Sequence, residues 1–107
     1  MATTTTIPIT VTEEAAARVA ELGMQREFEQ MLEHTVQTVP DLKSVEVILA
    51  PPYDTGDYPR VILEASRTVP LVPPDETESQ WWDWQIGTFP PRVCAHFLMQ
   101  TLHGECA

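Results

Sequence analysis

Residues that could bind a metal gather near the C-terminus. Two cysteines and two histidines there, Cys94, His96, His103 and Cys106, are of the types that ligate zinc or iron. If residues 90–103 form a helix, Cys94 and His96 point about 200° apart, and His96 and His103 stand about 10 Å apart along the axis. Only His103 and Cys106, alone or together with Glu105, could chelate one ion within the chain. We therefore predict no metal and no cofactor.

Two further candidates for catalysis have structural explanations. Asp54-Thr55-Gly56 is the tripeptide of aspartic proteases, but the flanking prolines, tyrosines and a further aspartate favour an ordinary turn. Cys94 lies near a predicted helix N-terminus, which lowers a thiol pKa, but it falls on the predicted buried face, where thiols are inert. The sequence therefore predicts no catalytic residue.

Three tryptophans give the strongest indication of molecular recognition. Trp82, Trp84 and Ile86 alternate with polar residues, which is typical of a strand over residues 80–86 with one buried face. Such a strand would turn Trp81 to the opposite face, where an exposed indole marks an interface. The alternative is a helix, which would spread the indoles over an arc too wide for one core face. We take the strand and keep the helix open.

The N-terminal half predicts a short strand and two helices. Alternating apolar residues over 7–11 fit a short edge strand, because Pro8 excludes a central position. Thr12, followed by two glutamates, is typical of a helix start. From Met24, apolar residues return at helical spacing and form one arc, and this second helix ends before Pro40.

The second half predicts a hairpin and a C-terminal helix. Alternation over 44–50 and 60–66 indicates two antiparallel strands, and the Pro-rich acidic stretch 67–79 is a long connection. A helix should begin near Pro90 and end at Gly104. Its polar face would carry Arg92, His96, Gln100 and His103.

The predicted fold is therefore α+β in two layers. An N-terminal helical segment and a C-terminal helix cover one face of a three-stranded antiparallel sheet, made of residues 44–50, 60–66 and 80–86. Residues 1–6 are a disordered tail, and residues 7–107 form a single domain. The uncovered sheet face would show Ile48, Ile62, Glu64 and Trp81, a half-apolar surface that a partner could bury.

One segment resembles a known family. Residues 9–16, Ile-Thr-Val-Thr-Glu-Glu-Ala-Ala, with Val19 and Leu22, are similar to the opening of A-type iron–sulfur carrier proteins. Those carriers use a mid-chain cysteine and a Cys-Gly-Cys near the end, whereas this chain has only Gly104-Glu105-Cys106 there. We attribute the likeness to shared helix-start chemistry and draw no function from it.

Charge narrows the classes of partner. Sixteen acidic and six scattered basic residues give a net charge of −10, which argues against nucleic acid and anionic membranes as partners. No signal peptide or membrane span is predicted, so we expect a soluble cytoplasmic protein. We predict a non-enzymatic binding or assembly module that uses Trp81, Ile48, Ile62 and Glu64. Its partner would be a protein or a second copy, as in a homodimer through the outer sheet face.

Two other classes of function remain open. A small metal-binding protein or hydrolytic enzyme would use His96, His103 and carboxylates of the 67–79 loop. An acidic inhibitor or nucleic-acid mimic would rest on the net charge alone.

Overall fold

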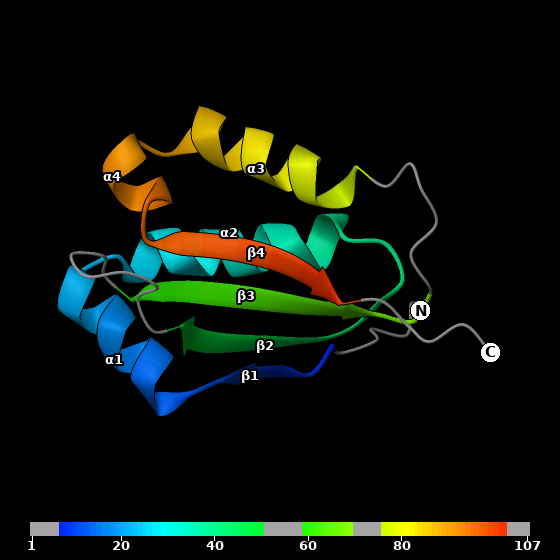
Figure 1. Ribbon diagram of the computed structural model, residues 1–107, viewed down its shortest axis with the longest axis horizontal. Helices are drawn as coiled ribbons and strands as arrows, with labels where there is room; N and C mark the ends of the chain where they lie inside the picture. The colour runs from blue at the N-terminus through cyan, green and yellow to red at the C-terminus, as the bar shows by residue number, and fades with distance from the viewer. Residues whose placement is uncertain (1–6, 51–58, 70–75, 103–107) are drawn as a thin grey trace, which may run out of the picture.

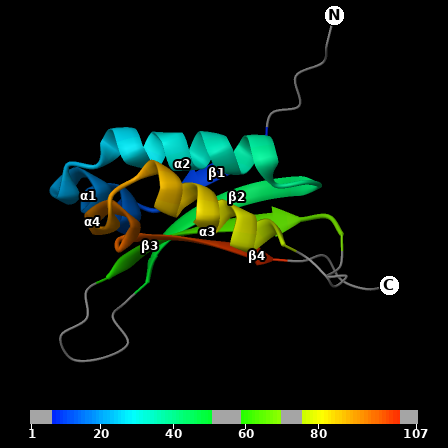
Figure 2. The ribbon, with the colours of Figure 1, turned by 90° about the horizontal axis from the view of Figure 1, so that it is seen from above.

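The computed structural model describes residues 7–50, 59–69 and 76–102. Within them the fold is α+β, with helices over one face of a four-stranded mixed sheet (Figures 1 and 2). The elements, in chain order, are β1 (Ile9–Val11), α1 (Glu13–Leu22), α2 (Gln25–Thr38), β2 (Leu42–Ala50), β3 (Arg60–Arg67), α3 (Thr77–Thr88), α4 (Pro91–Cys94) and β4 (Phe97–Leu102). The strands lie side by side in the order β1-β2-β3-β4. The pairs β1–β2 and β3–β4 are parallel, and β2–β3 is antiparallel.

Helix α1 begins and ends as its sequence predicts. The Thr12 side chain accepts a hydrogen bond from the Ala15 amide (3.2 Å), which satisfies one of the N–H groups that lack a partner in the first turn. At the other end, Gly23 adopts a left-handed conformation with φ of 68°. Its N–H bonds to the Ala20 carbonyl, and the next amide bonds to Val19, so the chain turns sharply into α2.

Helix α2 places its apolar arc on the sheet. Phe28, Met31 and Thr35 are its buried residues, and the Phe28 ring stacks on Phe97 of β4 with ring centroids 6.1 Å apart. Val39 is extended and precedes Pro40, as the steric effect of a proline on the preceding residue requires. The two predicted N-terminal helices and the edge strand β1 are thus confirmed.

The β2–β3 hairpin divides the sheet into two faces. Val47 pairs with Leu63 on the helix side, and both are fully buried. Because successive side chains alternate between faces, Ile48 and its partner Ile62 point to the side without helices, which we call the open face. Glu64 shares that face.

The predicted third strand is wrong. Residues 80–86 lie within α3, and β1 and β4 are the strands that make the sheet four-stranded and mixed. The strand prediction assumed one core face for all the indoles. Helix α3 has no such single face, because it lies along the sheet edge formed by β4 and also contacts α2 (Figures 1 and 2). Its aromatic residues therefore meet different neighbours around its circumference.

The predicted C-terminal helix is right only in its first turn. A helix does begin at Pro91, but α4 ends at Cys94, and residues 97–102 form β4. Val61 of β3 pairs with Phe97, and Leu63 pairs with Met99. The spacing of the apolar residues in 97–102 fits a helix and a strand equally. The segment is a strand because it pairs with β3. The predicted connection 67–79 is shorter than expected, because Arg67 ends β3 and Thr77 begins α3. Its residues 70–75, the predicted tail 1–6, the Asp54-Thr55-Gly56 turn and Gly104 lie outside the described residues.

Candidate functional site: an apolar groove beside the edge strand

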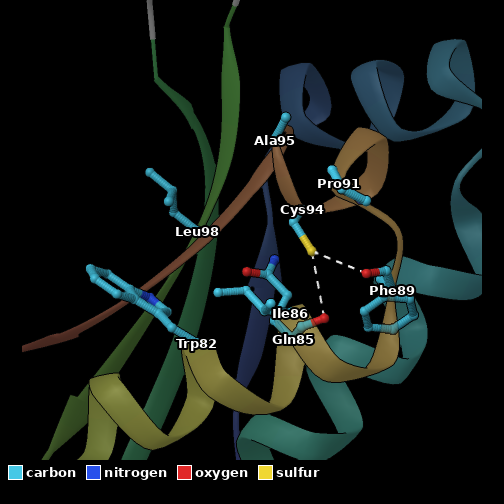
Figure 3. Close-up of a pocket in the computed structure, with 8 residues that line it drawn as sticks. All are labelled: Trp82, Gln85, Ile86, Phe89, Pro91, Cys94, Ala95 and Leu98. Atoms are coloured by element: carbon cyan, nitrogen blue, oxygen red, sulfur yellow. Dashed lines mark hydrogen bonds between the residues drawn. The ribbon is translucent and has the colours of Figure 1, made fainter.

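An apolar groove runs between α3 and the segment formed by α4 and β4 (Figure 3). It has a volume of about 370 Å³, within the range of small-ligand and side-chain pockets. Eight residues from these elements line it, and we call it the α3 groove: Trp82, Gln85, Ile86, Phe89, Pro91, Cys94, Ala95 and Leu98. At its rim, Ile86 is 69% exposed and Trp82 is 43% exposed. Large apolar side chains with this exposure, gathered at a groove, are typical of contact surfaces.

Two polar side chains of α3 cover the outer edge of β4. The Gln85 amide donates to the Phe97 carbonyl (3.1 Å), and a Glu78 carboxylate oxygen accepts from the Thr101 amide (2.8 Å) and hydroxyl (2.7 Å). Gln85 and Glu78 are two helical turns apart, so they face the same strand. The polar groups of an exposed sheet edge would otherwise be a template for another chain. Helix α3 therefore closes this edge of the sheet.

The thiol of Cys94 lies in the groove wall. Its Sγ is 3.5 Å from the Gln85 carbonyl oxygen and 3.6 Å from that of Phe89 (Figure 3). Burial raises the pKa of Cys94, against a smaller lowering by a backbone hydrogen bond. The thiol therefore stays protonated at neutral pH, whereas a nucleophilic cysteine needs a lowered pKa. Its geometry suits packing within the groove wall.

Two of the three indoles, Trp81 and Trp82, take the reverse of the predicted arrangement, whereas Trp84 packs against the core as expected. Trp81 was expected on an exposed face, but it is only 2% exposed, and its Nε1–H donates to the Thr35 hydroxyl (2.9 Å). That hydroxyl in turn donates to the Met31 carbonyl (2.7 Å). Trp82, expected in the core, is the exposed indole. The physical reason is the helix itself, since adjacent residues diverge by about 100° around its axis.

The predicted contact residues of the sheet lie together on the open face. Ile48 pairs with Ile62, which pairs with Leu98, so an apolar row crosses the face and reaches the α3 groove at Leu98. Glu64 is next to this row and pairs with Gln100. Ile62 is only 7% exposed, which leaves little of its side chain available for contact.

The predicted polar face of a C-terminal helix is wrong, because the helix ends at Cys94. Arg92 is exposed on α4, His96 lies in the turn before β4, and Gln100 is exposed on β4. These residues therefore belong to three different local structures. His103 lies outside the described residues. Within the described part of the chain, no three His, Cys, Asp or Glu side chains are placed to share a metal ion.

No protein-family model, curated protein or solved structure matches this chain. None of the helices in the described ranges has the length and apolar character to cross a bilayer.

The sequence held one signal for the groove. Trp82 and Ile86 are four residues apart, which places them on one face of a helix. This pairing is visible only once the helical alternative for residues 80–86 is taken. Leu98 carries no such signal, because its place beside them depends on the pairing of β4 with β3.

A second pocket, between α2 and α3, is lined in part by a stacked aromatic pair. The rings of His34 and Trp84 lie parallel, with centroids 3.7 Å apart and an interplanar angle of 3°. Trp84 also meets Phe89 edge to face. Burial lowers the pKa of His34. Burial also lowers the pKa of His96, followed by the positive charges of Arg18 and Arg60.

These two histidines should make stability depend on pH. A histidine in the unfolded chain has a pKa of about 6.5, so around and below that pH the unfolded state binds more protons than the folded state. Stability is then expected to fall as the pH drops from about 7.5 to about 5.5, before carboxylates titrate. Thermal unfolding across this range measures the loss.

The substitution His34→Phe keeps a ring on Trp84 and removes the titrating group. Its melting temperature should fall less than that of the parent over the same pH range. A parent melting temperature that rises on acidification, with no such rise in His34→Phe, would show instead that Trp84 stabilises the imidazolium by a cation–π contact.

Proposed function

We propose that this protein is a non-enzymatic binding module that receives an apolar group of its partner in the α3 groove. One observation carries the proposal: two large apolar side chains at the rim of the apolar groove are exposed to solvent. Ile86 is 69% exposed and Trp82 is 43% exposed. Exposed side chains of this size lose water when a partner covers them, and burial of one such side chain contributes about 1.5 to 3 kcal/mol.

The polar groups of the groove support binding in preference to chemistry. The Gln85 amide is engaged by the Phe97 carbonyl, and the Cys94 thiol lies against two carbonyl oxygens. Both side chains serve the fold. What they leave for a partner is apolar surface, which favours contact with an apolar side chain or ring.

Substitution at the rim should weaken binding of an apolar probe. Nile red, an uncharged dye whose fluorescence rises in apolar surroundings, serves as the probe. We expect Ile86→Ser to weaken its binding at least about tenfold, since the lost contact is of the order of 1.4 kcal/mol or more. A fluorescence titration of parent and variant measures the change.

The control is Ile9→Ser on β1. Ile9 is 45% exposed and lies at the opposite edge of the sheet from α3 (Figure 1). This substitution makes the same chemical change without touching the groove, so dye binding should stay as in the parent. Equal binding by the parent and Ile86→Ser would remove the basis of the proposal.

Other functions rest on fewer observations. Self-association through the open face would use the apolar row that ends at Leu98, and light scattering detects it as a doubled mass. A metal-binding or hydrolytic role would need His103 or loop carboxylates near His96. An inhibitory role for the acidic surface depends on the net charge of −10 alone.

A further inference from the structure

The outer edge of β4 is closed to an added strand. Thr101 and Phe97 direct an amide and a carbonyl toward α3, where Glu78 and Gln85 hold them. Met99, between them, directs its backbone to the same edge by the alternation of a parallel ladder. Phe97 and Met99 are fully buried, so their backbone groups are out of reach of another chain. A partner cannot extend the sheet at β4.

This closure limits the backbone that can occupy the groove. A peptide strand placed there would leave its own N–H and C=O groups without partners, because the Gln85 amide and the Cys94 thiol are already engaged. A buried unpaired backbone group costs about as much as a lost hydrogen bond. A helix satisfies its backbone internally and presents only side chains. The occupant that fits is therefore helical.

Charge selects the polar face of that helix. The segment 76–102 carries three carboxylates, Glu76, Glu78 and Asp83, of which Glu78 is bonded to Thr101, and one permanently cationic side chain, Arg92. Asp83 is exposed and lies three residues before Ile86, adjacent to it on the helix surface. The whole chain has a net charge of −10. This field attracts a cationic partner and repels a second copy of the same chain.

From these observations we infer that the α3 groove takes a cationic amphipathic α-helix of another protein. The apolar side chains of the helix lie between Trp82 and Leu98, and its lysines or arginines face Asp83 and are attracted by the net negative charge of the chain. This inference rests on the proposed function and names the class of partner. It is the helix-in-groove mode of recognition.

The test uses synthetic peptides of about 18 residues, long enough to form an amphipathic helix. One peptide has leucines on its apolar face and lysines on its polar face. A second replaces every lysine with glutamate, and a third carries two central prolines that break the helix. Each is titrated into the ¹⁵N-labelled full-length protein at low and at physiological salt, and the indole N–H resonances are followed.

The indole of Trp82 should move on addition of the lysine peptide. The Trp81 indole should stay in place, because it is buried and bonded to Thr35, and it reports any disturbance of the core. Binding should weaken as salt is added. It should weaken at least about tenfold in Ile86→Ser, the loss expected when one anchoring side chain is removed, and remain as in the parent in Ile9→Ser.

Three results would overturn the inference. Equal binding of the glutamate peptide would exclude the charge selection, and equal binding of the proline peptide would exclude the helix. A doubled mass in light scattering that Ile86→Ser abolishes would show that a second copy occupies the groove. In each case the proposed function would still hold if Ile86→Ser weakens Nile red binding. Loss of that dependence as well would end both proposals.

Discussion

Replacement of Trp81 by alanine is expected to lower the free energy of unfolding by about 3 to 5 kcal/mol. The side chain is 2% exposed, lies in the core, and contacts Trp84 with ring centroids 5.7 Å apart. Its loss opens a large cavity between α3 and α2 and removes the donor that meets the Thr35 hydroxyl. Urea denaturation followed by far-ultraviolet circular dichroism measures the change.

Trp82→Ala is the matched control, because it removes the same side chain one position along the chain. With 43% of that residue exposed, we expect a cost of about 1 kcal/mol or less, as for surface substitutions. Comparable losses for the two variants would contradict the orientation of α3. In the Nile red and peptide titrations we expect the opposite order, with Trp82→Ala weakening binding more than Trp81→Ala does.

The second large effect is expected at the edge of β4. The double substitution Glu78→Ala with Gln85→Ala removes every side-chain hydrogen bond described above between α3 and the backbone of this strand. The Phe97 carbonyl would stay buried without a partner, which costs about 1 to 3 kcal/mol, and the Thr101 amide would lose a bond to a charged acceptor of about 1.5 to 3 kcal/mol. We therefore expect a loss of about 3 to 5 kcal/mol in urea denaturation.

The same variant should associate through the opened edge. The lost stability lets α3 detach from β4 more often, and in that open form the outward N–H and C=O groups of β4 are available for pairing between chains. Light scattering should then show a mass that grows with protein concentration.

Glu76→Ala with Gln80→Ala makes equivalent changes of charge and size at exposed positions around the same helix, and it should leave stability and mass as in the parent. A double variant at Glu78 and Gln85 that matches this control would show that α3 is not needed to protect the sheet edge.

The sequence predicted those elements that local chemistry specifies. Thr12 caps α1, Gly23 ends it, and Pro40 limits α2, each through backbone atoms a few residues away. The β2–β3 hairpin follows from alternation in two strands that pair antiparallel with each other. The candidate groove was not predicted, because three separate segments build it and its exposed indole was assigned to the core.

Two segments show why the rest depended on tertiary structure. The apolar residues within 97–102 have a spacing that fits both a helix and a strand. The strand with which they pair is β3, more than thirty residues earlier in the chain. Residues 77–88 have no single apolar face. Trp81 of α3 lies in the core, Trp84 stacks on a ring of α2, and Trp82 is exposed to solvent. A periodicity search assumes one buried face and therefore favours the wrong element.

The amino-acid sequence by itself determined the acidic character of the surface, the two N-terminal helices, the central hairpin and the first turn near Pro91. Tertiary structure alone decided that Phe97 begins a strand and that the tryptophans lie on a helix. A cap or a turn is settled by hydrogen bonds within a few residues, whereas an edge strand and the helix beside it gain their stability only from contacts with each other and with the sheet.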